Sequence, residues 1–296
     1  MTPDTHALDG VTGEYRPQPV EFDVPPLRPG GGGTSGIASA GEMTRTEHLE
    51  AVRAGQLGSV HSWELVTAVD GPGTRLTVFL AGCPLRCLYC HNPDTMFANK
   101  GEPVLLKHLV KRVKRYRKIF RSTGGGLTIS GGEPLFQLNF TANLLRAAKE
   151  MGVHTAIDTS GFLGANVSDE MLQDIDLVLL DIKSGIPDVY RRVTGRELEP
   201  TLEFSRRLAD RGIETWVRFV LVPGLTDGVE NVEAVARHVA TLSNVSRVEV
   251  LPFHQMGRDK WAALGIDYEL EDTQPPSKEL VDRVRNQFRE HGITTY

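Results

Sequence analysis

The stretch Ile175-Asp176-Leu177-Val178-Leu179-Leu180-Asp181-Ile182 decides the fold class of this chain. It is the most apolar of the strands that the sequence predicts. A strand with apolar residues on both faces belongs at the centre of a parallel sheet that is covered on both sides. The sequence therefore predicts an α/β fold.

Strands and helices alternate on both sides of this stretch, from Gly58 to the end of the chain. Such alternation requires right-handed crossover connections and a parallel sheet of about six strands. We expect strands at 59–68, 74–81, 124–130, 153–158, 175–182, 214–222 and 247–251, and helices at 103–121, 140–151, 169–173, 188–193, 202–211, 229–242 and 278–291.

The positions of the polar residues favour a barrel over an open sheet. No G-x-G-x-x-G sequence follows the first strand, which excludes a dinucleotide-binding sheet. Polar residues stand instead at the carboxyl ends of the strands, where (β/α) barrels build their active sites. We predict a partial (β/α)6 TIM-type barrel with parallel strands and outer helices. The strand-end residues are the loop 83–90, Glu133, Asp158, Asp181, Arg218 and His254.

Composition narrows the function further. The chain has 296 residues and a net charge of −5, which argues against a general nucleic-acid binder. We interpret the lysines and arginines of the helix at 103–121 as a solvated face, since no aromatic platform accompanies them. No apolar run is long enough to cross a membrane, and the amino terminus has no secretory pattern. We therefore expect a cytoplasmic protein that binds neither nucleic acid nor membrane.

Residues 1–55 differ from the remainder. Five prolines between positions 17 and 29 lead into a glycine run at 30–33, and few bulky apolar residues are present. Such a segment cannot bury enough apolar surface to fold on its own. We predict a disordered or weakly ordered extension at 1–55 and one domain at 56–296. The alternative is a clamp that orders against a partner.

All the cysteines lie in one loop, Cys83-Pro84-Leu85-Arg86-Cys87-Leu88-Tyr89-Cys90. An odd number at C-x3-C-x2-C spacing makes a poor disulfide framework and a good metal site in a reducing compartment. Closed zinc and electron-carrier iron–sulfur sites use four protein ligands, so three cysteines leave one metal position open. A zinc loop that lacks one ligand, or three unconnected thiols, are the alternatives.

The cysteine loop together with Gly131-Gly132-Glu133-Pro134 resembles the radical S-adenosylmethionine (SAM) superfamily. Five further motifs resemble the pyruvate formate-lyase activating enzymes, and the resemblance runs from about residue 58 to the end. They are Val69-Asp70-Gly71-Pro72-Gly73, Cys87-Leu88-Tyr89-Cys90-His91-Asn92-Pro93, Asp158-Thr159-Ser160-Gly161, Leu180-Asp181-Ile182-Lys183 and Leu251-Pro252-Phe253-His254.

The resemblance implies a role for each of these residues. Cys83, Cys87 and Cys90 would hold a [4Fe–4S] cluster whose open iron binds SAM, and Asp181 and Lys183 would complete the catalytic set. SAM itself would contact ten motif residues, with Arg218 completing the pocket. The ten are Tyr89, Cys90, His91, Gly131, Gly132, Glu133, Asp181, Ile182, Lys183 and His254. A monovalent cation would bind Asp158, Thr159 and Asp181, and Asp70 would contact the partner's loop.

The function that the resemblance implies is the activation of pyruvate formate-lyase. The chain would cleave SAM reductively and remove a hydrogen from the Cα of a glycine, leaving a glycyl radical on the lyase. With no cysteine left for an inserted ferredoxin-like domain, it would need an external donor such as flavodoxin, and it would act as a monomer. Alternatives are activation of a different glycyl radical enzyme, modification of another peptide or small molecule, and a metal-binding scaffold without turnover.

Overall fold

The computed structural model describes residues 37, 39–41, 43–67 and 69–296. These residues form one eight-stranded sheet with the order β3-β1-β2-β4-β5-β6-β7-β8. The strands are β1 (Leu57–Thr67), β2 (Arg75–Leu80), β3 (Glu102–Leu105), β4 (Gly126–Gly131), β5 (His154–Thr159), β6 (Leu177–Asp181), β7 (Glu214–Leu221) and β8 (Val245–Pro252).

The sheet confirms the predicted fold class. From β2 through β8 the neighbouring strands pair in parallel, whereas β1 pairs antiparallel with both β2 and β3. The sheet is not closed, because β3 and β8 stand at its two ends. Six parallel strands in an open arrangement make a partial (β/α)6 barrel.

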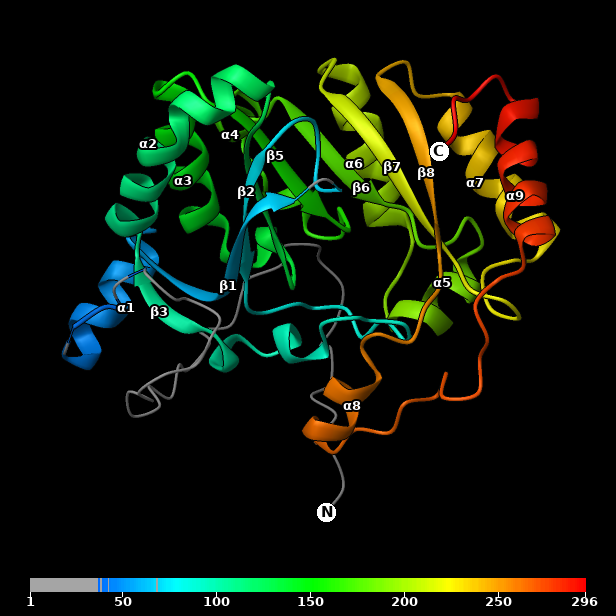
Figure 1. Cartoon of the computed structure of the whole chain (residues 1–296), viewed down its shortest axis with the longest axis horizontal. Coiled ribbons are helices and arrows are strands. Elements are labelled where there is room, and N and C mark those ends of the chain that lie inside the picture. The colour runs from blue at the N-terminus through cyan, green and yellow to red at the C-terminus, as the bar shows by residue number, and fades with distance from the viewer. Residues whose placement is uncertain (1–36, 38, 42, 68) are drawn as a thin grey trace, which may run out of the picture.

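Helices flank the curved sheet (Figure 1). None of the helices in the described part of the chain combines the length and the apolar character of a membrane span. The α-helices are α1 (Arg45–Arg53), α2 (Leu106–Thr123), α3 (Leu138–Glu150), α4 (Asp169–Gln173), α5 (Pro187–Thr194), α6 (Glu199–Asp210), α7 (Val229–Ala240), α8 (Arg258–Leu264) and α9 (Lys278–Glu290).

Strand β6 shows why its sequence is apolar on both faces. Val178 and Leu180 are fully buried in the large core between the sheet and the helices. Leu177 and Leu179 point the other way, into a small cluster with Trp216 of β7 inside the partial barrel. Alternate residues of a strand face opposite sides, so an apolar run of this length fills two cores at once.

Helix α1 lies within the predicted extension 1–55, and the domain boundary at residue 55 stays a prediction. Residues 45–53 form α1, whose start is fixed by a capping box in which the Thr44 and Glu47 side chains each bond the other's backbone N–H. Asn139 of α3 donates to the carbonyl of Arg53 at 2.8 Å, which attaches α1 to the domain. Residues 1–36 of the predicted extension lie outside the described part of the chain.

Two further elements were not predicted. The segment 102–105 is strand β3 rather than the beginning of a helix, because it pairs with Leu57–Val60 of β1. Helix α8 follows β8 directly and has seven residues. A helix this short presents too few turns for apolar periodicity to reveal it.

Replacing Phe204 of α6 with alanine should destabilise the domain strongly. Its ring is buried and packs directly against the backbone of Gly164, where even a Cβ would overlap the ring. Because Gly164 has no side chain, it cannot fill the cavity that the substitution leaves. The expected loss is about 3–5 kcal/mol in the free energy of unfolding, measured by urea denaturation. Ile119→Ala, at a half-exposed position on α2, is the control and should change it by less than about 0.5 kcal/mol. Equal effects would contradict the packing described.

Candidate active site

The cysteine loop begins where β2 ends, at the carboxyl end of the parallel strands. Cys87 is buried, Cys83 and Cys90 are partly buried, and all three are free thiols. Burial, reinforced by the neighbouring Cys87 sulfur, raises the pKa of Cys90 to about 12 and that of Cys83 well above its usual range. Ionisation of the three cysteines to thiolates would therefore need a nearby positive charge, such as that of a metal centre.

Backbone hydrogen bonds from remote segments hold this loop in place. The amides of Arg86 and Leu88 donate to the carbonyls of Thr194 and Val193, at 2.8 and 3.0 Å, at the end of α5. The amide of Cys83 donates to the carbonyl of Met96 at 3.1 Å. The loop forms no helix or strand, so these hydrogen bonds to other segments fix its backbone instead.

Helix α8 holds the third cysteine. The Trp261 indole N–H donates to the carbonyl of Cys90 at 2.9 Å. Gly257, which precedes the helix, lies so close that a Cβ there would stand 2.8 Å from the Cα of His91 and 2.9 Å from the Cys90 carbonyl oxygen. Sequence reasoning missed both residues. A tryptophan shortly after the Pro-Phe-His motif is the only signal that pointed to them.

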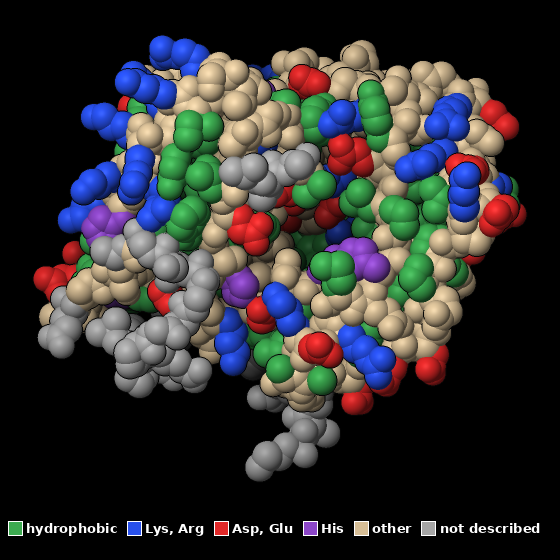
Figure 2. Space-filling view, viewed as in Figure 1, with side chains coloured by type: hydrophobic (Ala, Val, Ile, Leu, Met, Phe, Trp, Pro, Cys, Tyr) green, Lys and Arg blue, Asp and Glu red, His purple; other side chains and the backbone are tan. Residues whose placement is uncertain are grey.

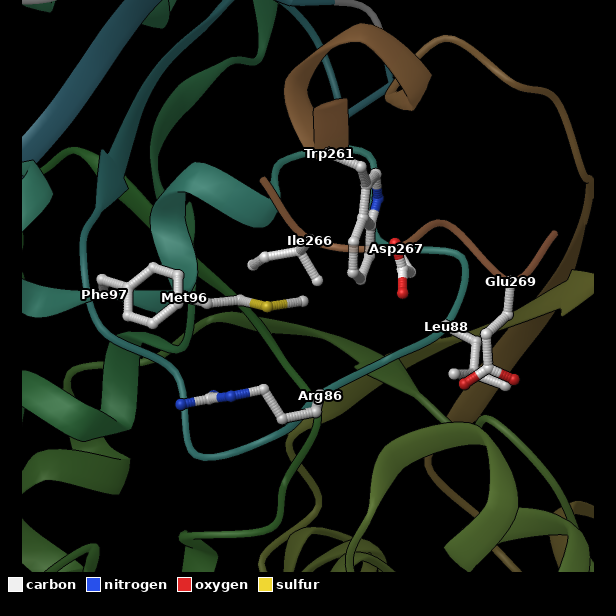
Figure 3. A pocket seen from close by; sticks show the side chains of 8 residues that line it. All are labelled: Arg86, Leu88, Met96, Phe97, Trp261, Ile266, Asp267 and Glu269. Atoms are coloured by element: carbon white, nitrogen blue, oxygen red, sulfur yellow. The ribbon is translucent and has the colours of Figure 1, made fainter. Parts of the chain in front are cut away.

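A pocket of about 340 Å³ lies between the cysteine loop and α8. Figure 3 shows Met96, Trp261 and Ile266 pointing toward one another in it, with Arg86 of the cysteine loop along one side. The remaining lining residues are Leu88, Phe97, Asp267 and Glu269. None of the strand-end residues described next is among the residues that line this pocket.

Lys183 and Asp181 come together as their spacing predicts. The Lys183 ammonium donates to the Asp181 carboxylate at 2.8 Å and lies 5.6 Å from the centre of the Tyr89 ring. Burial opposes the charge on Lys183, but Asp181 outweighs it and raises the lysine pKa well above its usual range. The Tyr89 hydroxyl is buried and has no hydrogen-bond partner within the described residues.

His91 and His254 form a stacked pair, with ring centres 3.9 Å apart and an angle of 27° between the planes. His91 Nε2 lies 3.2 Å from the carbonyl oxygen of His254. Burial, followed by repulsion from His254, lowers the pKa of His91 to about 4, so the ring is neutral near pH 7. His254 Nδ1 is buried without a partner among the residues that are described. Such an atom is available to a ligand.

Glu133 joins the ends of β4 and β5. Its buried carboxylate accepts hydrogen bonds from the Thr159 hydroxyl at 2.5 Å, the Ser160 hydroxyl at 2.6 Å, and the amides of Ser160 and Leu135 at 3.0 and 3.1 Å. Burial raises its pKa, and these bonds oppose the rise. The side chain thus fixes one strand end against the next, and any role in holding SAM stays a prediction.

The glycines before Glu133 are explained by the packing of the chain itself. Gly131 has φ +115°, and a Cβ on it would stand 2.3 Å from the backbone of Leu80 in β2. A Cβ on Gly132 would stand 2.5 Å from the carbonyl oxygen of Gly82 and 2.6 Å from that of Thr95. Both positions need glycine before any ligand is considered.

Arg218 occupies the centre of a buried charge cluster, and its contact with SAM stays a prediction. It lies 3.3 Å from the Asp158 carboxylate, 3.1 Å from Glu249 and 3.9 Å from Asp70, and it also donates to the carbonyl of Val69. It therefore ties β5, β7 and β8 to the β1–β2 turn across the inside of the barrel. Burial opposes its charge, but Asp158 and the other carboxylates raise its pKa.

The predicted cation site is only partly assembled by side chains. Burial raises the pKa of Asp158 to about 6, although Arg218 opposes this. The Thr159 hydroxyl donates to Glu133 and accepts from the amide of Gly161, so it is already engaged. Within the described residues, no three His, Cys, Asp or Glu side chains are grouped to hold one ion. A cation at Asp158, Thr159 and Asp181 stays a prediction.

Comparison with known proteins identifies the family. The model of the radical SAM superfamily matches residues 77–238. The chain belongs to the radical SAM superfamily. Its members use a [4Fe–4S] cluster together with SAM, and the three free cysteines, which a cationic centre would stabilise, fit such a cluster.

Within the superfamily, the chain belongs with the pyruvate formate-lyase-activating enzymes. It is 39% identical over 238 residues to pyruvate formate-lyase 1-activating enzyme of Escherichia coli K12, covering 80% of this chain and 97% of that one. It is 43% identical over 231 residues to the activating enzyme of Staphylococcus epidermidis, covering 76% and 92%.

Solved structures agree on the radical SAM fold. A domain of pyruvate-formate lyase-activating enzyme from Bacteroides vulgatus superposes with a TM-score of 0.50 at 25% identity, covering 58% of this chain and 98% of that one. A radical SAM methyltransferase from Sphaerobacter thermophilus gives a TM-score of 0.57 at 17% identity, covering 86% and 81%. The second likeness concerns the fold alone.

Arg218→Met should lower the free energy of unfolding of this radical SAM domain by about 3–5 kcal/mol near pH 7, because it removes the cationic partner of the buried Asp158 and Asp70 carboxylates. Adding Asp158→Asn to that variant should restore part of the loss. Urea unfolding of the two single variants and the double variant measures the coupling. Independent effects would show that Arg218 is not the counter-ion of this cluster.

Proposed function

We propose that this chain installs a glycyl radical on pyruvate formate-lyase. The observation that carries the proposal is the near-complete match to enzymes named for that activation, which covers 97% of the Escherichia coli relative. The chain has three cysteines, all in one loop. It therefore has none for additional clusters and depends on an external one-electron donor of the flavodoxin type.

Cys83, Cys87 and Cys90 are the residues that would hold the cluster, each through its thiolate. A reduced [4Fe–4S] cluster held there would supply the one-electron reductive cleavage of SAM to methionine, the chemistry by which a hydrogen atom would be removed from the glycine Cα. The chain's contribution is to fix the loop, and the bonds from α5 and α8 to its backbone support that role.

The ion pair of Lys183 and Asp181 would orient SAM beside the cysteines. Lys183 is buried and remains charged because of Asp181, so it can attract the carboxylate of the methionine part. The Tyr89 ring and the unpartnered Nδ1 of His254 offer an apolar face and a polar contact to the adenosine part. These contacts would exclude water from a reactive radical.

The glycine loop of the lyase would enter from the open side of the partial barrel. Figure 2 shows a hollow on this face of the molecule, with acidic side chains in and around it. Asp70 reaches the interior on the β1–β2 turn, where the Thr77 hydroxyl donates to it at 3.2 Å. An entering loop would contact Asp70 there. We infer that the enzyme works as a monomer in the cytoplasm, where free thiols persist.

Replacing Cys83, Cys87 or Cys90 with alanine should abolish both cluster assembly and SAM cleavage. Iron analysis after anaerobic reconstitution should give roughly four irons per chain for the unmodified protein and far fewer for each variant. Retention of four irons by any of these variants would remove that cysteine from the ligand set.

Asp181→Ala should weaken SAM binding while leaving the cluster in place, because the Asp181 carboxylate accepts a hydrogen bond from Lys183 and is not one of the predicted cluster ligands. Loss of the charge partner should raise the dissociation constant for SAM by about tenfold or more, in line with the cost of breaking a buried charged pair. Equilibrium binding to the reconstituted protein measures it, and the iron content serves as the control. A variant that loses the cluster instead would contradict this assignment.

The radical transfer itself is tested by electron paramagnetic resonance. The reconstituted protein, reduced and mixed with SAM and pyruvate formate-lyase, should produce the doublet signal of a glycyl radical on the lyase. A lyase variant with alanine at the target glycine is the control and should give no such signal. SAM cleavage without a radical on the lyase would point to a different substrate.

A further inference from the structure

Helix α2 carries an unusual concentration of positive charge. Eight of its 18 residues are lysine or arginine, and none is acidic. Seven of the eight are exposed, and we call these seven the basic ridge: Lys107, Lys111, Lys114, Arg115, Arg117, Lys118 and Arg121. The whole chain has a net charge of −5, so the ridge opposes the character of the rest of the protein.

The ridge differs from the exposed faces of the other helices because α2 itself contains no Asp or Glu. Arg191 of α5 pairs with Asp188 at 3.0 Å, Arg206 of α6 with Glu199 at 2.9 Å, and Arg237 of α7 with Glu233 at 3.6 Å. No ion pair joins a ridge residue to a carboxylate in the described part of the chain.

The arrangement of the ridge also works against the stability of α2. Lys107 and Lys111, Lys114 and Lys118, and Arg117 and Arg121 stand four residues apart, where like charges weaken a helix. A helix face that only had to be soluble would carry both acidic and basic side chains. The loss of helix stability from like-charge repulsion therefore indicates a binding role.

The end of the ridge lies beside the turn that reaches into the barrel. The amide of Thr74, next to the β1–β2 turn, donates to the hydroxyl of Thr123 in the last turn of α2 at 3.3 Å. A Cβ on Gly73 would stand 2.4 Å from the Thr123 carbonyl oxygen, so the two segments touch. Figure 2 shows Lys and Arg side chains gathered over α2, on the face that carries the hollow.

We propose that the basic ridge docks an acidic surface of the protein that carries the target glycine. This inference rests on the proposed function, because a macromolecule whose loop fills the hollow must cover the face around it. Opposite charge at the rim speeds the encounter and fixes the orientation of the two proteins. The acidic side chains in and around the hollow (Figure 2) would repel an acidic surface from its centre. The acidic surface of the partner would thus bind at the rim of the hollow, and only its glycine loop would enter the hollow.

Other occupants fit less well. A membrane-surface helix keeps its apolar side free for lipid, but Leu109, Val113 and Phe120 of α2 are buried in the protein core. Single-stranded nucleic acid requires exposed aromatic side chains, whereas Trp63 beside α2 lies under Arg112, whose guanidinium stands 4.0 Å from the ring centre. An electron donor has to approach the cysteine loop, which follows the carboxyl end of β2. The ridge instead ends beside the β1–β2 turn, which precedes the amino end of β2.

The test is reversal of three ridge charges, Lys114→Glu, Arg117→Glu and Lys118→Glu, in the reconstituted holoenzyme. The matched control reverses Arg237, Lys278 and Arg289, which lie on α7 and α9 and change the net charge equally. At low salt, kcat/KM for radical formation on intact pyruvate formate-lyase should fall about tenfold or more for the ridge variant, and its dependence on ionic strength should flatten. The control should stay within about twofold of the unmodified protein.

Two substrates separate docking from chemistry. With a short peptide that contains the target glycine, and with chemical reduction in place of a protein donor, the ridge variant should match the unmodified protein. The glutamine variant at the same three positions should lose less than the glutamate variant, which shows that charge and not folding is responsible.

The inference is overturned if the ridge variant activates intact lyase normally, if the control loses as much, or if the peptide reaction falls equally. Loss of donor-driven reduction alone would assign the ridge to the donor instead, and binding of a DNA duplex by the unmodified protein at the same salt would assign it to nucleic acid. Failure of the unmodified protein to form any radical on the lyase would instead refute the proposed function.

Discussion

The structure depends on how an irregular loop with three cysteines is held still. Buried thiolates repel one another, and the loop lacks the ladder of bonds that would fix a strand or helix. Its backbone is held instead by Val193 and Thr194 at the end of α5 and by Trp261 of α8. Strand order brings these segments to the carboxyl ends of the parallel strands. The open barrel is therefore the frame that turns three neighbouring cysteines into a binding site.

The inside of the barrel is organised by charge. Carboxylates from the β1–β2 turn, β5 and β8 meet the guanidinium of Arg218, and the β8 carboxylate of Glu249 also pairs with Arg247 at 3.1 Å, while Asp181 of β6 pairs with Lys183. These buried charges have partners of opposite sign, whereas the buried carboxylate of Glu133 is satisfied by hydroxyl and amide donors. This division separates two roles: Arg218 ties distant strands together, and Lys183 keeps its charge next to the cysteines. The basic ridge on α2 takes no part in these buried ion pairs, and we attribute its charge to binding of an acidic partner protein.

The sequence was sufficient for the fold class because β6 is apolar on both faces and polar residues follow the strand ends. It also placed Lys183 beside Asp181, since residues two apart in an extended chain share a side. It could not foresee that Thr159 and Ser160 turn to Glu133, or that Arg75 is fully buried with its guanidinium 2.6 Å from the Thr128 hydroxyl. Such contacts join strands by side chains that have no periodic pattern. The short helix α8, which carries Trp261, was not predicted because its seven residues also show no periodic pattern.

The central claim is that a hydrogen atom leaves the Cα of a glycine in the lyase and arrives on the 5′ carbon derived from SAM. The most direct measurement uses pyruvate formate-lyase labelled with deuterium at the Cα of its glycines, followed by mass spectrometry of the 5′-deoxyadenosine that the reconstituted protein forms. The account predicts one deuterium in that product and none when the target glycine is replaced by alanine. Unlabelled 5′-deoxyadenosine in the presence of labelled, intact lyase would contradict it.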